Sequence, residues 1–299
     1  MIGAVTLFRI RGVPVRLHAS WLVVVALIMW TLSVGYFPVA VPELATADYW
    51  TYGLAATLLL FVSVFLHELS YTLVALAFGI PVSGITLHVF GGLSQMEREP
   101  DRPVAEVLIA AVGPITSFAL AGLLLGLVAL LDPAPSVTAT LEYLAAVNAL
   151  IGLFNLTPGF PLDGGRLLRA ALWRYRGDIE SATRTATRAG AVVAFVLVGL
   201  GTVYLVGGDF LGGACLILIG LFLYHAGQSS YREALVARAL DPFTVADVMT
   251  RQVLHVPSDL TVGRVVQDML WRNHVSSLPV LRGPQVVGVV SLDRIKAVP

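Results

Sequence analysis

Six charge-poor apolar segments constrain this chain more than any other feature. A helix needs about 20 apolar residues to cross the hydrocarbon core of a bilayer, and each segment is close to or above that length. Of the 299 residues 57% are hydrophobic and only 13% are charged, whereas a soluble domain carries about 25% charged residues. The sequence therefore predicts a polytopic membrane protein, and excludes a disulfide scaffold and a conventional soluble enzyme. The predicted spans are residues 18–38, 52–78, 105–131, 140–157, 188–206 and 210–229.

The basic residues predict the orientation of these spans. All 19 Lys and Arg lie in segments 1–17, 79–104 and 158–188 or after residue 229, and the alternate loops contain none. Basic loops stay in the cytoplasm, so we expect a multi-pass protein of the plasma membrane with both termini cytoplasmic. The start MIGAVTLFRIRG lacks a signal-peptide pattern, which predicts that the first span is retained. No basic tract suggests a nucleic-acid partner.

The composition changes near the C-terminus to that of a soluble α/β module. Apolar spacing predicts a helix over 261–273, and two β-branched runs predict strands separated by a turn at Gly283-Pro284. We therefore expect a membrane domain over residues 1–230, a linker over 231–244 and a small module over 245–299.

Two ionisable residues, His67 and Glu68, lie deep inside the second predicted span. A charge at mid-membrane costs about 2.5–3.5 kcal/mol, which favours a functional role facing the protein interior. A neutral pair bonded to a neighbouring helix is the structural alternative. A second polar cluster, NLTPGFPLDGGRLLRA, places Asp163 on a backbone broken by two prolines. His, Glu and Asp together suit a catalytic zinc site in which Glu is the general base.

Three segments carry a resemblance to a known family: HELSYTLVALAFGIPVSGITLHVFGG, AVGPITSFALA and NLTPGFPLDGGRLLRA. They resemble the site-2 proteases, which are intramembrane zinc metalloproteases, and most closely the bacterial and archaeal six-span branch with a C-terminal CBS region. The resemblance implies that His67 and Asp163 bind zinc, that Glu68 is the base and that Asn155 holds the substrate backbone. The implied reaction cleaves a peptide bond within a transmembrane segment of a membrane-tethered regulator, such as an anti-sigma factor.

One position departs from the family pattern. The second histidine of HExxH would fall at residue 71, which is Tyr71 here. A phenol has an ordinary pKa near 10 and binds metal only if it loses its proton. Three interpretations stay open: the chain is inactivated, Tyr71 is a substitute ligand, or another histidine, with His88 the candidate, completes the site. Metal affinity and activity depend on which applies.

Residues 84–97 alternate apolar and polar side chains around Gly91 and Gly92. This pattern predicts a β-hairpin after the second helix, with a tight turn at the two glycines. The hairpin could be an amphipathic cap, or an edge strand to which an extended substrate adds by main-chain hydrogen bonds. The predicted fold is thus an all-α polytopic membrane protein with six transmembrane helices and a small hairpin, followed by a small α/β module.

Residues 245–297 resemble a single CBS motif. Such motifs work as pairs that bind adenine nucleotides. A pair would need either a second copy of this chain, in a homodimer, or a longer chain. The position of the ribose-binding Asp of the family is Arg294, and Asp293 lies one place early. Nucleotide binding and a docking role without nucleotide both remain open.

Three functions follow from the sequence. The first is a zinc endopeptidase with hydrolysis impaired by Tyr71. The second is a pseudoprotease that binds single-span membrane clients without cutting them. The third, a transporter gated by its CBS module, predicts internal repeats and ionisable residues on several spans, and the sequence shows neither.

Overall fold

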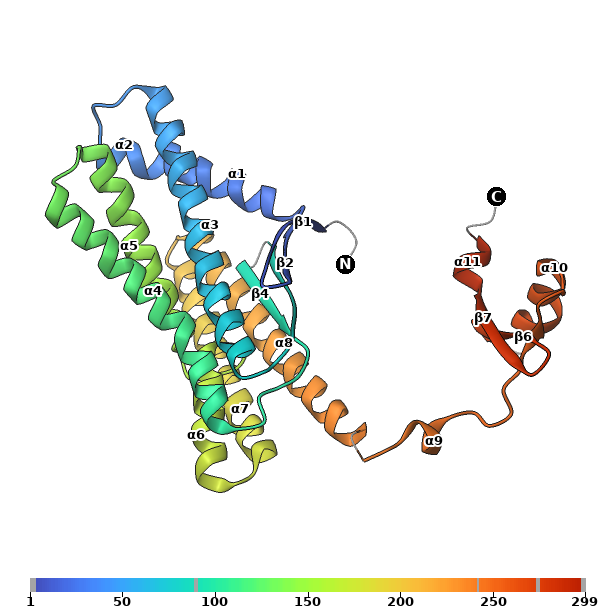
Figure 1. Ribbon diagram of the computed structural model, residues 1–299. Coiled ribbons are helices and arrows are strands. Elements are labelled where there is room, and N and C mark those ends of the chain that lie inside the picture. Colours follow the sequence, from blue (N-terminus) through green and yellow to red (C-terminus); the bar gives the residue numbers. More distant parts are fainter. Residues whose placement is uncertain (1–3, 89–90, 241, 273–274, 297–299) are drawn as a thin grey trace. The chain divides into compact units, whose positions relative to one another are not determined.

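The computed structural model describes residues 4–88, 91–240, 242–272 and 275–296 (Figure 1). The chain forms two compact units, residues 1–237 and 238–299. The last long helix, α8 (Phe210–Leu240), does not end at the predicted boundary at residue 230. It continues through most of the segment 231–244 that was expected to be a linker.

Among the described residues of the first unit, six helices are long and apolar enough to cross a membrane, which confirms the predicted architecture. The first crossing combines α1 (Trp21–Thr31), a π-helical turn (Leu32–Tyr36) and α2 (Phe37–Ala40). The others are single helices, and large apolar side chains on their outer faces are exposed. These five are α3 (Thr46–Ala77), α4 (Pro103–Leu131), α5 (Pro135–Asn155), α7 (Ile179–Val206) and α8.

Local sequence signals explain where these helices begin. Pro103 and Pro135 occupy first-turn positions of α4 and α5, where the missing N–H of proline costs nothing. The carboxylate of Asp178 accepts hydrogen bonds from two backbone N–H groups at the start of α7. This cap lies ten residues before the predicted start of the fifth span, so α7 extends the span beyond its apolar part.

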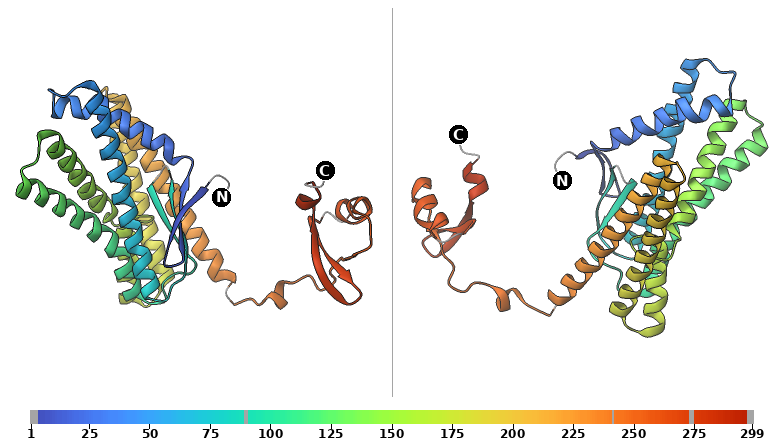
Figure 2. Two further views of the ribbon diagram at one scale, coloured as in Figure 1. Left: turned by 45° about the horizontal axis from the view of Figure 1, so that its top comes forward. Right: turned by 180° about the vertical axis from the view of Figure 1, so that it is seen from behind.

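A four-stranded sheet lies against one side of the helical bundle (Figure 2). Its order is β1 (Ala4–Ile10), β2 (Val13–His18), β3 (Val82–His88) and β4 (Gly91–Met96). The β2–β3 pair is parallel and the other two pairs are antiparallel. The predicted hairpin is therefore present as β3 and β4, but the strands β1 and β2 were not predicted from the short Arg-containing N-terminal segment.

The predicted position of the hairpin turn is wrong. Gly91 and Gly92 belong to β4, where they pair with His88 and Leu87. The residues between the strands, 89–90, lie outside the described part of the chain. Close packing explains the glycine at position 92, since a Cβ there would lie 2.2 Å from Cγ of Glu68.

The sheet packs on the second half of α3. Val13, Val15 and Ile85 from the sheet and Tyr71 and Ala75 from α3 share one buried cluster. This contact places β4 beside the helix that carries the HELSY segment.

The second unit has the predicted helix and the two predicted strands, together with further short elements. It contains α9 (Val245–Val248), β5 (Val256–Pro257), α10 (Val262–Arg264) continued by a π-helical segment (Val265–Trp271), β6 (Ser277–Arg282), β7 (Gln285–Ser291) and α11 (Leu292–Lys296). The strand order is β5-β6-β7, and the core contains Val256, Val265, Leu270 and Leu278.

Candidate active site

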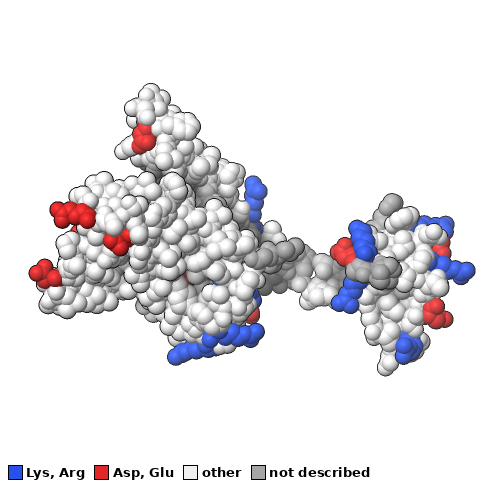
Figure 3. Space-filling view, turned by 90° about the horizontal axis from the view of Figure 1, so that it is seen from above, with Lys and Arg blue, Asp and Glu red and all other residues white. Residues whose placement is uncertain are grey.

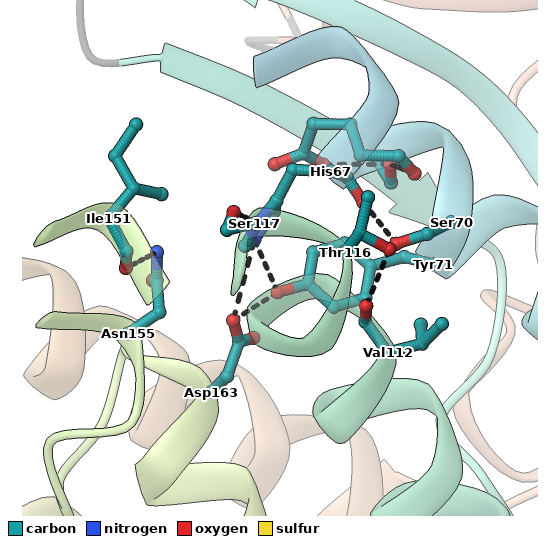
Figure 4. Close-up of polar contacts among 11 residues, drawn as sticks. His67, Ser70, Tyr71, Val112, Thr116, Ser117, Ile151, Asn155 and Asp163 are labelled. Atoms are coloured by element: carbon teal, nitrogen blue, oxygen red, sulfur yellow. Dashed lines mark hydrogen bonds and ion pairs between the residues drawn. The ribbon is translucent and has the colours of Figure 1, made fainter. Parts of the chain in front are cut away.

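His67, Tyr71 and Asp163 meet inside the membrane unit (Figure 4). His67 and Tyr71 lie four residues apart on one face of α3 and are both buried. Asp163, also buried, is the first residue of α6 (Asp163–Arg176). The Tyr71 hydroxyl donates to Oδ2 of Asp163 and lies 2.8 Å from Nε2 of His67, while His67 Nε2 and Asp163 Oδ2 are 3.7 Å apart.

A proton count defines the state of this network. A phenol has one proton, and Tyr71 donates it to Asp163. The contact between Tyr71 and His67 therefore needs a proton on Nε2 of the imidazole. Nδ1 of His67 lies 2.8 Å from the hydroxyl of Ser117, which can donate to it. In this arrangement the Nε2 lone pair of His67 is not available to a metal ion.

The helix α4 supplies two supporting residues. Ser117 orients the His67 ring through Nδ1, and Gly113 lies directly against the network. A Cβ at Gly113 would be 2.2 Å from the Tyr71 hydroxyl and 2.7 Å from His67 Nε2. Both residues belong to the AVGPITSFALA segment. The sequence indicated that this segment resembles a known family, but it predicted no role for Gly113 or Ser117.

A buried ion pair fixes α6 against α4. Nε of Arg169 donates to Oε1 of Glu106 at 2.6 Å, and Nη1 donates to Glu99 at 3.1 Å. Arg169 and Glu106 are buried, and the Arg169 guanidinium lies 5.1 Å from the centre of the Phe160 ring. This pair was not predicted, although Glu106 in the third span was a visible signal. It holds the helix that begins with Asp163.

The carboxylate of Glu68 is hydrogen-bonded to β4. Oε2 of Glu68 lies 2.8 Å from the Ser94 hydroxyl, and Ser94 also lies 3.1 Å from the Glu68 carbonyl. Thr72 donates to Ser94 at 3.3 Å. The carboxylate of Glu68 is thus held next to the edge strand of the sheet.

Asn155 and His88 do not enter the network. Nδ2 of Asn155 donates to the Ile151 carbonyl of its own helix at 3.0 Å, and Figure 4 shows it beside, but not bonded to, Asp163. Within the described residues no group of three His, Cys, Asp or Glu is placed to hold a metal ion. His88 therefore does not complete a site with His67 and Asp163.

The donors fit zinc only in part. Two ligands of a tetrahedral zinc ion, each about 2.0–2.1 Å from the metal, lie about 3.4 Å apart, close to the 3.7 Å between His67 Nε2 and Asp163 Oδ2. The hydroxyl of Tyr71 is instead hydrogen-bonded to both side chains. Its 2.8 Å separation from His67 Nε2 is shorter than the separation of two ligands on one ion. As they stand, the described residues do not fit a three-ligand catalytic zinc site.

Comparison with known proteins gives the family. Residues 55–134 and 131–199 match peptidase family M50, and residues 245–298 match the CBS domain. A protein named zinc metalloprotease Rip3, from Mycobacterium tuberculosis, is 37% identical over all of this chain and 77% of its own length. This chain belongs to the M50 (site-2 protease) family.

Other M50 proteins support the same assignment. A Synechocystis protein that carries zinc metalloprotease in its name, sll0528, is 34% identical over 96% of this chain and 76% of its own length. The solved structure of the site-2 protease from Methanocaldococcus jannaschii matches with a TM-score of 0.51 and 28% identity, over 76% of this chain and 94% of that one. Proteolysis within the membrane is general for M50 proteins, and these relatives are named for zinc. The predicted family and fold are thus confirmed.

Proposed function

We propose that this chain is a zinc endopeptidase of the membrane in which Tyr71 impairs metal binding and peptide hydrolysis. The observation that supports this is the position of the Tyr71 hydroxyl, which is hydrogen-bonded to both His67 and Asp163. Those two side chains remain at a separation suited to zinc. Replacing Tyr71 by the histidine that HExxH requires would remove the phenol and add an imidazole ligand. Glu68 is the proposed general base.

The client in this proposal is one transmembrane segment of a membrane-tethered regulator, such as an anti-sigma factor. A peptide bond inside a helix is shielded, so the segment has to unwind before cleavage. β4 is the last strand of the sheet order, and an extended segment could add to it by main-chain hydrogen bonds. We assign Gly91, Gly92 and Asn155 to this binding step, because Gly92 lies against Glu68 and Asn155 lies beside Asp163.

The proposed location is the plasma membrane, with both termini in the cytoplasm. All 19 Lys and Arg fall on one side of the six-span arrangement. Figure 3 shows acidic and basic residues of the membrane unit on separate parts of the face that it presents. The positive-inside rule then makes the basic side cytoplasmic.

The CBS unit is proposed to pair with the CBS unit of a second chain. Val286, Val287 and Val289 of β7 are each about half to two-thirds exposed, and consecutive strand residues point to opposite faces of a sheet. A second CBS unit would cover at least one of these faces. Adenine nucleotide between the paired units is part of the same proposal.

Zinc content tests the proposed function directly. The full chain, Tyr71→His and Tyr71→Phe are purified in detergent and analysed for bound zinc by elemental mass spectrometry. We expect close to one zinc per chain only in Tyr71→His, because Tyr71→Phe opens space without adding a ligand. Cleavage of a co-reconstituted single-span anti-sigma factor should follow the zinc content and disappear in the double variant Glu68→Gln, Tyr71→His. If the unaltered chain bound as much zinc as Tyr71→His, the proposal that Tyr71 impairs metal binding would be refuted.

A second candidate function is a pseudoprotease, favoured by the closed network of Ser117, His67, Tyr71 and Asp163. In this network the side chains of these four residues are hydrogen-bonded to one another without metal. Such a protein would bind the single-span client as tightly as Tyr71→His does. Co-purification of an uncut client with the unaltered chain would favour this function over residual proteolysis.

A further inference from the structure

A cavity of about 300 Å³ lies between α7 and α8. Each residue that lines it carries a side-chain group able to donate a hydrogen bond, and two of them are cationic. Within the part of the chain that the structure describes, the lining contains no carboxylate. The lining residues are Arg184, Thr187, Arg188, Gln228 and Tyr231.

The two arginines use only part of their capacity to donate hydrogen bonds. Nε of Arg184 donates to the Tyr231 hydroxyl at 3.2 Å, and Nη2 donates to Glu180 at 3.0 Å. These contacts orient the Arg184 guanidinium and leave three of its five N–H groups available to donate to a ligand. Arg188 makes no hydrogen bond or ion pair with the part of the chain that the structure describes. The cavity therefore holds net positive charge, which suits an anion with several oxygens.

The cavity lies where the apolar part of both helices ends. Residues 190–206 of α7 and 210–227 of α8 contain no Asp, Glu, Lys or Arg. Val192, one turn beyond Arg188, is 63% exposed. Farther along, the rings of Phe195 and Tyr224 are in contact, with their centres 5.5 Å apart. A cationic pocket bordered by an exposed apolar and aromatic surface is the arrangement expected at headgroup depth in a membrane.

We propose that this cavity binds the phosphate group of an anionic phospholipid in the leaflet on the basic side of the protein. Basic pockets between transmembrane helices bind such headgroups. The guanidinium groups of Arg184 and Arg188 contact the phosphate oxygens, and the acyl chains lie along Val192 and Phe195. A soluble phosphate would use only the polar part of this surface, which is why we assign the site to a lipid.

The site adjoins the loop that leads to Asp163. A Cβ at Gly190 would lie 2.0 Å from the Phe160 carbonyl oxygen, and a Cβ at Gly227 would lie 2.9 Å from it. Gly190 and Gly227 are each within three residues of a cavity residue. A headgroup bound between α7 and α8 therefore holds together the two helices that flank this loop, and lipid should raise the unfolding temperature. This inference is independent of whether the chain cleaves peptides.

The test measures binding of one phosphatidylglycerol molecule to the detergent-purified full chain by native mass spectrometry, with phosphatidylcholine of the same acyl chains as reference. The double variant Arg184→Gln, Arg188→Gln removes the two charges. Each arginine near a membrane surface is worth about fivefold in affinity, so the double variant should bind phosphatidylglycerol roughly thirtyfold more weakly. The control, Arg102→Gln with Arg174→Gln, removes two exposed charges outside the cavity and should bind normally.

Three results would overturn the proposal. Equal binding of phosphatidylcholine would show that the phosphate charge is not recognised in this pocket. An equal loss in the control variant would show that only overall charge matters. Competition by glycerol 3-phosphate or inorganic phosphate at the concentration of the lipid would assign the site to a soluble anion. If the double variant does not fold, Arg188→Gln alone decides, because Arg188 has no hydrogen bond or ion pair to lose among the described residues, and about fivefold weaker binding is expected.

Discussion

Removing the hydroxyl oxygen of Tyr71 should show how much this group stabilises the membrane unit. Tyr71→Phe keeps the ring in the cluster with Val15 and Ile85. It deletes the hydrogen bonds to His67 and Asp163. The substitution therefore separates hydrogen bonding from packing.

The expected loss follows from the groups left behind. A hydrogen bond to a charged acceptor such as Asp163 contributes about 1.5–3 kcal/mol, and a neutral one contributes about 0.5–1.5 kcal/mol. His67 Nε2 and Asp163 Oδ2, now 3.7 Å apart, can approach by less than about 1 Å and form a direct hydrogen bond. That contact also ends on the charged carboxylate, so it recovers the larger of the two contributions. We expect a net loss of about 0.5–1.5 kcal/mol in the free energy of unfolding.

The assay is reversible unfolding of the detergent-purified chain in dodecyl sulfate, followed by circular dichroism, with chelator present to remove metal. Thr202→Val is the matched control, because it also deletes one hydroxyl from a transmembrane helix. Thr202 is exposed and donates only to a carbonyl of its own helix, so its removal should change stability by less than about 0.5 kcal/mol. If the free energy of unfolding of Tyr71→Phe equals that of the unaltered chain within experimental error, the phenol does not join α3 to α6.

Three further predictions concern the surroundings of the site. Arg169→Met leaves Glu106 buried without its partner and should cost about 3–5 kcal/mol; adding Glu106→Leu should restore most of this stability in the same unfolding assay. Gly113→Ala places a Cβ 2.2 Å from the Tyr71 hydroxyl and should destabilise the chain by about 1–3 kcal/mol, whereas Gly122→Ala, with nothing within 4 Å of the new Cβ, should be neutral or stabilising. Burial lowers the pKa of His88, so the unfolded state binds more protons. The unfolding temperature should then fall as the pH drops below about 6.5, the ordinary pKa of histidine, and His88→Gln should reduce that dependence.

The sequence predicted the features that depend on long stretches of the chain. The six spans were evident because lipid requires about 20 apolar residues in succession, and TADYW…ALA of α3 and PVAEV…ALL of α4 meet that requirement. The side chains at residues 67 and 163 were evident because polar groups are rare at membrane depth. Their neighbours were less visible, since Ser117 and Ser94 are ordinary residues in apolar or amphipathic segments and only the packing of α4 and β4 on α3 brings them into contact.

The N-terminal strands show a different limit. β1 and β2 are short, and only β2 has a clear buried face, with Val13 and Val15 inside. The sheet exists because β2 pairs in parallel with β3, which lies about 65 residues farther along the chain. Pairing at that sequence distance leaves no local signal. Arg9 in β1 and Arg11 in the β1–β2 turn indicated only that this segment is cytoplasmic, not which structure it forms.

The network around Tyr71 explains how the fold can persist when the second histidine of HExxH is absent. A zinc ion held by α3 and α6 would tie these two helices together, and loss of one ligand would weaken that link. The phenol of Tyr71 reaches from α3 to Asp163 on α6 and forms the link by hydrogen bonds instead, while Ser117 joins His67 to α4. The same contacts keep a proton on Nε2 of His67, so the arrangement that stabilises the helices also opposes metal binding. Stability and metal binding should therefore change in opposite directions when metal-free Tyr71→His is compared with the unaltered chain.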